Sequence, residues 1–305
     1  MSDRAQGELV VIATPIGNLG DVTVRARELL GGVDLLCCED TRTTGKLLSL
    51  LGIAPPRLLS LHEHNEAERA NEIVERLRDG QRVGLVCDAG TPLLSDPGGR
   101  VVSAAIGAGF AVVAAPGASA ALGALVVSGF GGGRFRFEGF LPRKGKERAG
   151  RVAAVVSSPD PVVLYEAPRR VLATLADLAR ACDGERLVAI SRELTKLHEQ
   201  TWQGPLAAAV SSPVALAQRG EYVVVISGAP ETDDRGRDLG ATLDKLATAG
   251  LSRHDAVAAL EVILGVSHRV AYDAALAHRG FPGSGWAAPE GVRIGDEGQD
   301  PVSIG

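Results

Sequence analysis

A loop rich in carboxyl and hydroxyl groups, DAGTPLLSDPG at residues 88–98, follows an apolar run at residues 83–87. The run is typical of a buried strand, and open α/β sheets bind ligands at the carboxyl ends of such strands. Gly90 permits close backbone approach, while Thr91 and Asp96 offer donors and acceptors to a polar small molecule. The loop predicts a small-molecule site, and an ordinary strand-to-helix connection is the alternative that the pattern leaves open.

Charged side chains follow two further expected strands. The segment EDTRTTGKLL at residues 39–48 contains Gly45-Lys46 but lacks the earlier glycine and the following Ser or Thr of a nucleotide-triphosphate loop. In HEHNE, at residues 62–66, two histidines share a strand face, but no third histidine or cysteine cluster lies nearby to complete a metal site. We therefore expect a charged site edge with no metal, where the histidines form hydrogen bonds at a cleft.

Three other segments place polar groups at expected strand ends: ATPIGNLGD at residues 13–21, YEAPRR at 165–170 and SRELTKLHE at 191–199. The first has glycines spaced Gly-x-x-Gly and is not the dinucleotide-binding fingerprint. A tight turn for the first segment and surface ion pairs for the other two remain the simpler interpretations.

Residues 134–151 are strongly basic, with seven basic and two acidic side chains and so a local net charge of +5. Phe135, Phe137 and Phe140 are interleaved with these charges. The alternation in RFRFEGF indicates that the phenylalanines face a core, so the segment predicts contact with phosphates without base stacking. A solvated edge of the fold is the alternative.

Strand-like and helix-like segments alternate along the chain, which predicts two α/β domains and a small helical segment. Residues 1–117 predict a largely parallel sheet covered on both faces, because the apolar runs are continuous. Residues 118–229 predict a second α/β domain with more antiparallel character. A linker is expected at 230–240, short helices within 241–280, and a disordered polar tail at 283–305.

Composition narrows the class of protein. The net charge of −5 argues against a generally basic nucleic-acid binder. No apolar run reaches the roughly 18 residues of a membrane helix, and the polar amino terminus does not resemble a secretory signal. Four cysteines, two of them adjacent, make a poor disulfide framework, so we expect a cytoplasmic protein.

Together these segments resemble the tetrapyrrole methylase superfamily and, within it, a group of methyltransferases of small-subunit ribosomal RNA. The strings that carry the resemblance span about residues 9–228 in order: ATPIGNLGDVT, CCEDTRTTGKLL, SLHEHNE, LVCDAGTPLLSDPG, PGASA, FEGFLPRKGKER, YEAPRR and SRELTKLHE. The helical segments GLSRHDAVAAL and GVSHRVAYDAAL also fit, whereas the tail lies outside the resemblance.

The resemblance implies a homodimer of two-domain subunits that holds S-adenosylmethionine (SAM) in the cleft between the domains. It implies 2′-O-methylation of a cytidine ribose in 16S rRNA of the small ribosomal subunit, without a metal. A methyltransferase acting on a tetrapyrrole, such as a corrinoid or sirohaem precursor, is the nearest alternative. A non-catalytic RNA-binding module is the alternative from another class.

The resemblance also assigns residues to roles. Cofactor contacts are expected at Pro15, Gly90, Thr91, Leu94, Ser95, Asp96, Ser119, Ala120, Tyr165, Glu166 and Ala229. A ribose hydroxyl needs a base or a nearby cation to become a nucleophile, and the candidates for that role are His62, His64, Glu39 and Lys196. Our hypothesis is that His64 and Lys196 frame the hydroxyl. RNA contacts are expected at Arg143, Lys144, Lys146, Arg169 and Arg170.

Overall fold

The computed structural model describes residues 7–131, 133–182, 184–230, 234–264, 266 and 268–281. The chain divides into two compact units, Met1–Pro230 and Glu231–Gly305. The first unit contains two five-stranded sheets, and the boundary expected after residue 117 falls between them. The expected tail at 283–305 lies outside the described residues.

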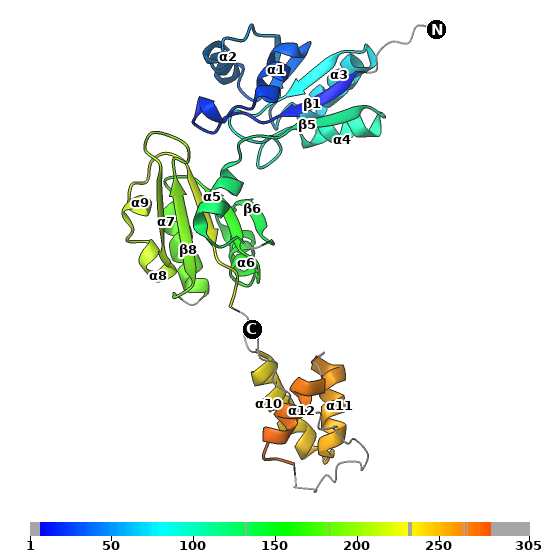
Figure 1. Ribbon diagram of the computed structural model, residues 1–305, viewed down its shortest axis with the longest axis vertical. Helices are drawn as coiled ribbons and strands as arrows, with labels where there is room; N and C mark the ends of the chain where they lie inside the picture. Colours follow the sequence, from blue (N-terminus) through cyan, green and yellow to red (C-terminus); the bar gives the residue numbers. More distant parts are fainter. Residues whose placement is uncertain are drawn as a thin grey trace, which may run out of the picture. The chain divides into compact units, whose positions relative to one another are not determined.

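The first sheet is entirely parallel, as its continuous apolar runs predict, with strand order β3-β2-β4-β1-β5. Alternate residues of these strands point to opposite faces, so each face has its own core. Helices α1 and α2 cover one face, and α3 and α4 cover the other (Figure 1). The elements are β1 (Glu8–Ile12), the 3₁₀ helix η1 (Leu19–Asp21), α1 (Val24–Gly32), β2 (Leu35–Cys38), α2 (Thr41–Leu50), β3 (Arg57–Ser60), α3 (Glu66–Arg78), β4 (Arg82–Leu85), α4 (Gly99–Gly107) and β5 (Ala111–Ala115).

The second sheet is mostly antiparallel, with strand order β6-β7-β10-β8-β9 and a parallel pair only between β6 and β7 among the described strands. Its small-residue helix α5 packs on one face, and α6 to α9 pack on the other. The elements are α5 (Ala120–Ser128), β6 (Arg136–Phe140), α6 (Gly145–Val156), β7 (Val162–Glu166), α7 (Val171–Ala181), β8 (Leu187–Arg192), β9 (Gln200–Pro205), α8 (Leu206–Ala209), α9 (Pro213–Leu216) and β10 (Tyr222–Ile226).

The second unit contains three helices, α10 (Asp234–Thr248), α11 (Arg253–Leu264) and α12 (His268–Ala277), around a small apolar core. The linker expected at residues 230–240 is wrong from Asp234 onward, because α10 begins there. Leu239 and Leu243, four residues apart, are both buried in this core, and that packing outweighs the charged, glycine-containing sequence. Among the described residues no helix has the length and hydrophobicity needed to cross a lipid bilayer.

Candidate functional site

The loops that follow β1, β4 and β5 meet at the carboxyl edge of the first sheet. Thr14 and Gly90 form an isolated bridge, with N···O distances of 2.9 and 3.1 Å between their backbone groups. Gly90 has φ +89°, and a Cβ added there would lie 3.1 Å from Ile16 Cγ2. Thr91 Oγ1 donates to the carbonyl of Ala118 at 3.0 Å. The close approach that the sequence predicts at Gly90 is therefore made against this chain's own loops.

The second half of the 88–98 loop has an unusual backbone. Leu93 and Ser95 have φ of 76° and 71°, a region that side chains other than glycine rarely adopt. The buried carboxylate of Glu66 accepts hydrogen bonds from the backbone nitrogens of Gly98, at 2.9 Å, and Arg100, at 2.7 Å. These charge-assisted bonds satisfy the first turn of α4 and hold the strained loop in place.

A cavity of about 370 Å³ opens between the two sheets. Its walls come from the 88–98 loop, from the start of α5, and from the edge of the second sheet where β6 and β7 end and β10 begins. Eight of the eleven expected cofactor contacts line it: Gly90, Thr91, Leu94, Ser95, Asp96, Ala120, Tyr165 and Glu166. The lining also contains Ile16, Asp88, Ala89, Phe140, Ala167, Pro168, Gly220, Glu221, Tyr222 and Val223, which the sequence reasoning missed.

The other three expected contacts lie elsewhere. Pro15 precedes the lining residue Ile16, and Ser119 caps α5 by accepting from the backbone nitrogen of Leu122. Ala229 is at the wrong end of its strand, because β10 runs antiparallel to β7 and its first residue, Tyr222, pairs with Glu166. The start of β10 reaches the cavity and its end does not, so the structure does not support Ala229 as a cofactor contact.

The charge of the cavity wall is one-sided. Four carboxylates line it, on Asp88, Asp96, Glu166 and Glu221, and none of its lining residues is Lys, Arg or His. Burial, together with the charges of Glu39 and Asp88, raises the pKa of Asp96 to about 6. This wall favours a ligand that carries positive charge.

Glu39 belongs to the same acidic group on the first sheet. Burial and the neighbouring carboxylates of Asp88 and Asp40 raise its pKa above the ordinary value. Asp88 also accepts a hydrogen bond from the backbone nitrogen of Asp40, at 3.1 Å, which connects the loop after β2 to the cavity wall. Glu39 is therefore beside the acidic wall without lining the cavity.

His62 and His64 contact each other, with ring centroids 6.0 Å apart, but neither lines the cavity. His64 is exposed, and the Nδ1 atom of His62 is buried without a hydrogen-bond partner among the described residues. Asn65 precedes α3 but does not cap it with its side chain. Its amide instead accepts from the backbone nitrogen of His62 and donates to the carbonyl of Ser60, so it shapes the turn before α3.

Lys196 lies in the loop between β8 and β9 of the second sheet, next to the cavity-lining residue Glu221. Its Nζ is 2.9 Å from Glu193 Oε1 and 3.1 Å from Oε2 of the lining residue Glu221. Burial lowers the pKa of Lys196, but the hydrogen bonds to the two carboxylates outweigh it and the pKa is raised. A Cβ added at Gly17 would lie 2.3 Å from Lys196 Cγ, so the ATPIGN loop covers the lysine stem. Lys196 is therefore a fixed cation, and it is not a base.

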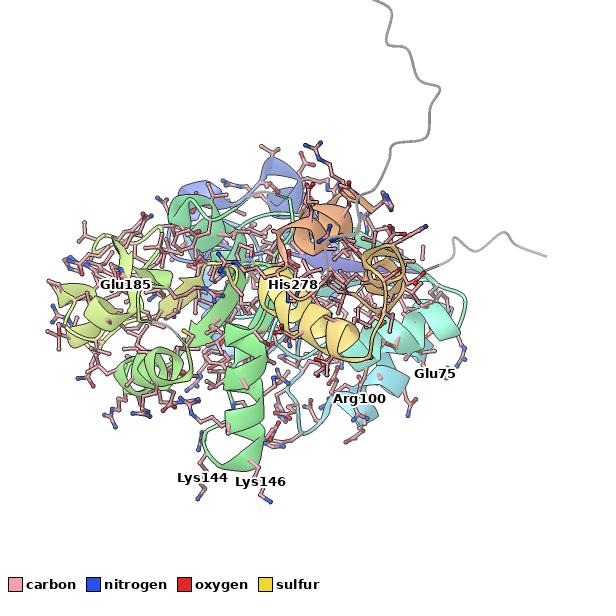
Figure 2. The ribbon with its side chains drawn as sticks, turned by 90° about the horizontal axis from the view of Figure 1, so that it is seen from below. Glu75, Arg100, Lys144, Lys146, Glu185 and His278 are labelled. Carbon is pink, nitrogen blue, oxygen red and sulfur yellow. The ribbon has the colours of Figure 1, made fainter. Side chains whose placement is uncertain are left out.

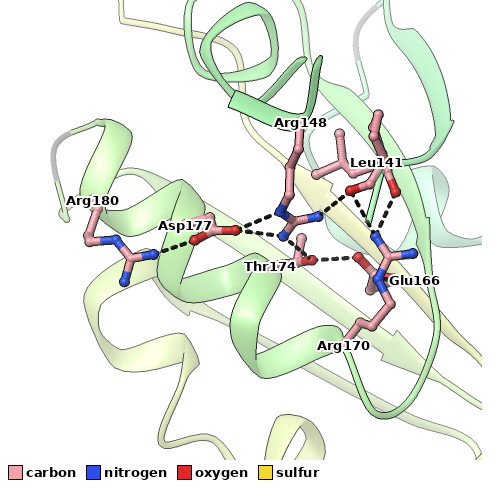
Figure 3. A network of polar contacts seen from close by, with 8 residues as sticks. Leu141, Arg148, Glu166, Arg170, Thr174, Asp177 and Arg180 are labelled. Atoms are coloured by element: carbon pink, nitrogen blue, oxygen red, sulfur yellow. Dashed lines mark hydrogen bonds and ion pairs between the residues drawn. The ribbon is translucent and has the colours of Figure 1, made fainter. Parts of the chain in front are cut away.

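Arg148 of α6 and Arg170, which precedes α7, form hydrogen bonds and ion pairs with other groups of this chain (Figure 3). Arg170 pairs with Glu166 and donates to the carbonyls of Leu141, at 2.6 Å, and Pro142, at 3.3 Å. Arg148 donates to the carbonyl of Pro142, to Thr174 Oγ1 and to Asp177. Arg170 is thus a clamp on the loop after β6, and the expectation that it contacts RNA conflicts with its partners.

The cations available to a partner lie at the tip of that loop. Arg143, Lys144 and Lys146 are exposed and, within the described residues, form no ion pair. Figure 2 shows Lys144 and Lys146 at the start of α6, directed away from the ribbon. Arg169 is also exposed, beyond the end of β7. Arg143, Lys144 and Lys146 of the loop after β6, together with Arg169 of the loop after β7, are therefore exposed cations that a partner can reach.

Comparison with known proteins identifies the family. Residues 8–210 match the family model for tetrapyrrole (corrin/porphyrin) methylases. The chain is 44% identical to the ribosomal RNA small subunit methyltransferase I of Synechocystis sp. over 82% of this chain and 90% of that protein. The chain belongs to this group of the tetrapyrrole methylases. Proteins of the same name from Escherichia coli O157:H7 and Pseudomonas aeruginosa are 40% and 42% identical over 92% and 90% of the chain, and 98% of each relative is covered.

Solved structures confirm the predicted fold class. A diphthine synthase superposes with a TM-score of 0.57 at 14% identity, covering 72% of this chain and 90% of that one. A Thermus thermophilus uroporphyrin-III C-methyltransferase, complexed with S-adenosylhomocysteine (SAH), superposes with a TM-score of 0.52 at 16% identity, covering 72% and 97%. In the part of the chain that the structure describes, no group of three or more His, Cys, Asp or Glu side chains is arranged to hold a metal ion.

Proposed function

We propose that this protein transfers the methyl group of SAM to 16S rRNA of the small ribosomal subunit, and that the acceptor is the ribose 2′-oxygen of a cytidine. The names of the relatives support the ribosomal substrate, and the cavity supports the donor. The ribose acceptor and the cytidine come from the resemblance stated above.

The observation that carries the proposal is the acidic, cation-free cavity wall. SAM has a sulfonium charge that SAH lacks, so the carboxylates of Asp88 and Asp96, which form no ion pair among the described residues, favour the donor over the product. Apolar and aromatic side chains of Ile16, Leu94, Tyr165 and Val223 complete a lining typical of a cofactor pocket. The residues present therefore fit a cationic nucleoside.

The chain's own residues position the reaction and manage the proton. SAM supplies a methyl group on a sulfonium, whose thioether leaves as a neutral group. Lys196, held as a cation at the rim, stabilises negative charge on the attacking ribose oxygen. Glu39 follows β2 of the first sheet, close enough to the lining residue Asp88 for their charges to interact, and its pKa is raised. Its carboxylate can accept the hydroxyl proton. The remainder of the rate enhancement comes from alignment in the cavity.

A tetrapyrrole acceptor is the alternative. The chain is 40–44% identical to proteins named for small-subunit ribosomal RNA and 16% identical to a uroporphyrin-III C-methyltransferase, so the relatives favour the ribosomal substrate. The test compares methyl transfer from labelled SAM to undermethylated small ribosomal subunits and to a uroporphyrinogen under the same conditions. Methyl transfer only to the subunits supports the proposal, whereas methyl transfer only to the uroporphyrinogen contradicts it.

A homodimer in the cytoplasm, where ribosomal subunits assemble, belongs to the same proposal. Apolar side chains are exposed on α5, at Leu122 and Val126, and on the sheet edge β5, at Val113. Exposed apolar side chains that gather into one patch are typical of a protein interface, so these positions are the candidates for it. Light scattering on the purified chain should give about twice the 31.5 kDa mass of one chain, and a monomer would remove this part of the proposal.

A further inference from the structure

One aromatic side chain at the mouth of the cavity belongs to no hydrophobic core of the described residues. Phe140, the last residue of β6, lines the cavity and is 50% exposed. The alternation in RFRFEGF predicts that its phenylalanines face a core. This prediction is wrong for Phe140 and for Phe135, which are both exposed, although Phe137 does pack against the core of the second sheet. Phe140 thus places a half-exposed aromatic ring at the cavity wall, where a ligand can reach it.

A β-bulge turns Phe140 toward the cavity. The register of β6 against β7 shifts between Phe137 and Gly139, and Gly139 has φ +67°. A Cβ added at Gly139 would lie 2.7 Å from Ser95 Oγ, so the bulge brings β6 close to the 88–98 loop. Bulges next to active sites commonly redirect one side chain, and Phe140 is the side chain redirected here.

The ring of Phe140 contacts the ring of Tyr165. Their centroids are 5.7 Å apart at an interplanar angle of 61°, and Phe137 contacts the same tyrosine at 5.0 Å and 74°. Edge-to-face contacts of this kind favour one orientation of the ring. Phe140 therefore combines a preferred orientation with a half-exposed surface, which are the properties of a stacking platform.

We propose that Phe140 stacks on the base of the nucleotide that is methylated. This inference rests on the proposed function. A ribose oxygen that reaches the methyl group must enter the cavity mouth, so its base must leave the stack of the RNA and find another surface there. Aromatic side chains supply that surface for single-stranded RNA.

The basic loop supports the same placement. Arg143 and Lys144 follow Phe140 by only three and four residues, and Leu141 and Pro142 between them are clamped by Arg148 and Arg170. Phosphates that flank the flipped nucleotide would thus meet cations on the loop that begins at the platform. A basic surface next to a base-stacking ring is the arrangement expected for binding single-stranded RNA.

The kinetic test uses Phe140→Leu, which keeps apolar bulk and removes the aromatic face. We expect kcat/KM for undermethylated small subunits to fall about 5- to 100-fold, since stacking contributes on the order of 1–3 kcal/mol per base. SAM affinity should change less than about twofold. Phe140→Trp should keep most activity, and Phe135→Leu, which alters another exposed phenylalanine (41%) outside the cavity lining, is the matched control.

A binding experiment separates the RNA base from the adenine of the cofactor. Tryptophan fluorescence of Phe140→Trp, compared with the parent, should be quenched by an oligocytidylate and not by an abasic oligomer of the same length. Quenching by SAH alone with no further effect of the oligocytidylate, or no quenching by either, would overturn the inference. Because this readout needs no turnover, it remains valid even if the parent fails to methylate subunits and the proposed function fails.

Discussion

The carboxylate of Glu66, in the first turn of α3, accepts a hydrogen bond from the backbone nitrogen of Gly98 at 2.9 Å. The bond joins the HEHNE segment to the loop that lines the cavity, two features that are 32 residues apart. It explains why a glutamate in that segment is buried, and it gives the segment a role in shaping the cavity. The cavity wall therefore depends on a residue that does not line it.

Replacing Glu66 by alanine should loosen the 88–98 loop. The change removes two charge-assisted hydrogen bonds to backbone groups, so we expect a loss of about 3 kcal/mol of unfolding free energy and at least fivefold weaker SAM binding. Denaturant unfolding and a SAM titration measure the two effects. Glu68→Ala, an exposed position on the same helical turn, is the control, and equal effects in both variants would contradict this role.

Cofactor binding should depend on pH through Asp96. A bound cation favours the ionised carboxylate, so SAM affinity should rise as the pH increases through about 6, where Asp96 ionises. SAH, without the sulfonium, should show a weaker rise. Titration calorimetry from pH 5 to 7 measures both.

Two variants isolate the group responsible. Asp96→Asn should abolish the pH dependence, and Glu39→Gln should move its midpoint below that of the parent, because the Glu39 charge raises the pKa of Asp96. A pH profile that survives unchanged in Asp96→Asn would assign the ionisation to a group other than Asp96.

Lys196→Met should impair turnover far more than cofactor binding. The variant keeps the methylenes beneath the ATPIGN loop but removes the cation from between Glu193 and Glu221. We expect kcat to fall at least tenfold, while SAM affinity stays within about threefold because the wall becomes no less negative. Lys245→Met, an exposed lysine of α10, is the control. Equal losses of kcat and SAM affinity would exclude the catalytic role.

The loop tip should contribute phosphate contacts. Replacing Arg143, Lys144 and Lys146 together by alanine should weaken RNA binding and reduce the slope of log K against log salt by about 2 to 3. Fluorescence anisotropy with a labelled rRNA fragment, at several salt concentrations, gives the slope. An unchanged slope would mean that these side chains do not touch phosphates.

Arg170→Lys tests whether Arg170 holds the loop after β6 in place instead of contacting phosphates. A lysine keeps the charge but has a single nitrogen, which cannot replace both Nε, beside Glu166, and Nη2, beside the two carbonyls. The loop after β6 should therefore loosen and the melting temperature should fall. We expect weaker RNA binding with the salt slope of the parent. In Arg170→Ala, a slope reduced by about 1 would instead restore Arg170 as a phosphate contact.

The sequence predicts much of this site because parallel strands bring their carboxyl ends to one edge. That rule brings Gly90 and Asp96 to the cavity wall, and the resemblance adds Tyr165 and Glu166. The resemblance also named Ala229, which lies at the other end of β10, because the apolar run of that strand does not reveal that it is antiparallel to β7. The same ambiguity hides Glu221 at the start of that strand.

Other differences come from contacts that are distant in sequence. Arg170 looks like any exposed arginine until Leu141 and Pro142, 29 and 28 residues away, supply its acceptors. The bulge that redirects Phe140 has one signal, the isolated Gly139 within a strand pattern, and simple alternation overlooks it. Tertiary packing decides both cases.

The most direct test is to incubate small ribosomal subunits that lack this modification with labelled SAM and the protein, then to digest the RNA and map the label by mass spectrometry. The account predicts 2′-O-methylcytidine at a single site in 16S rRNA. Label on a base, or no transfer by a protein that still binds SAM, would contradict it.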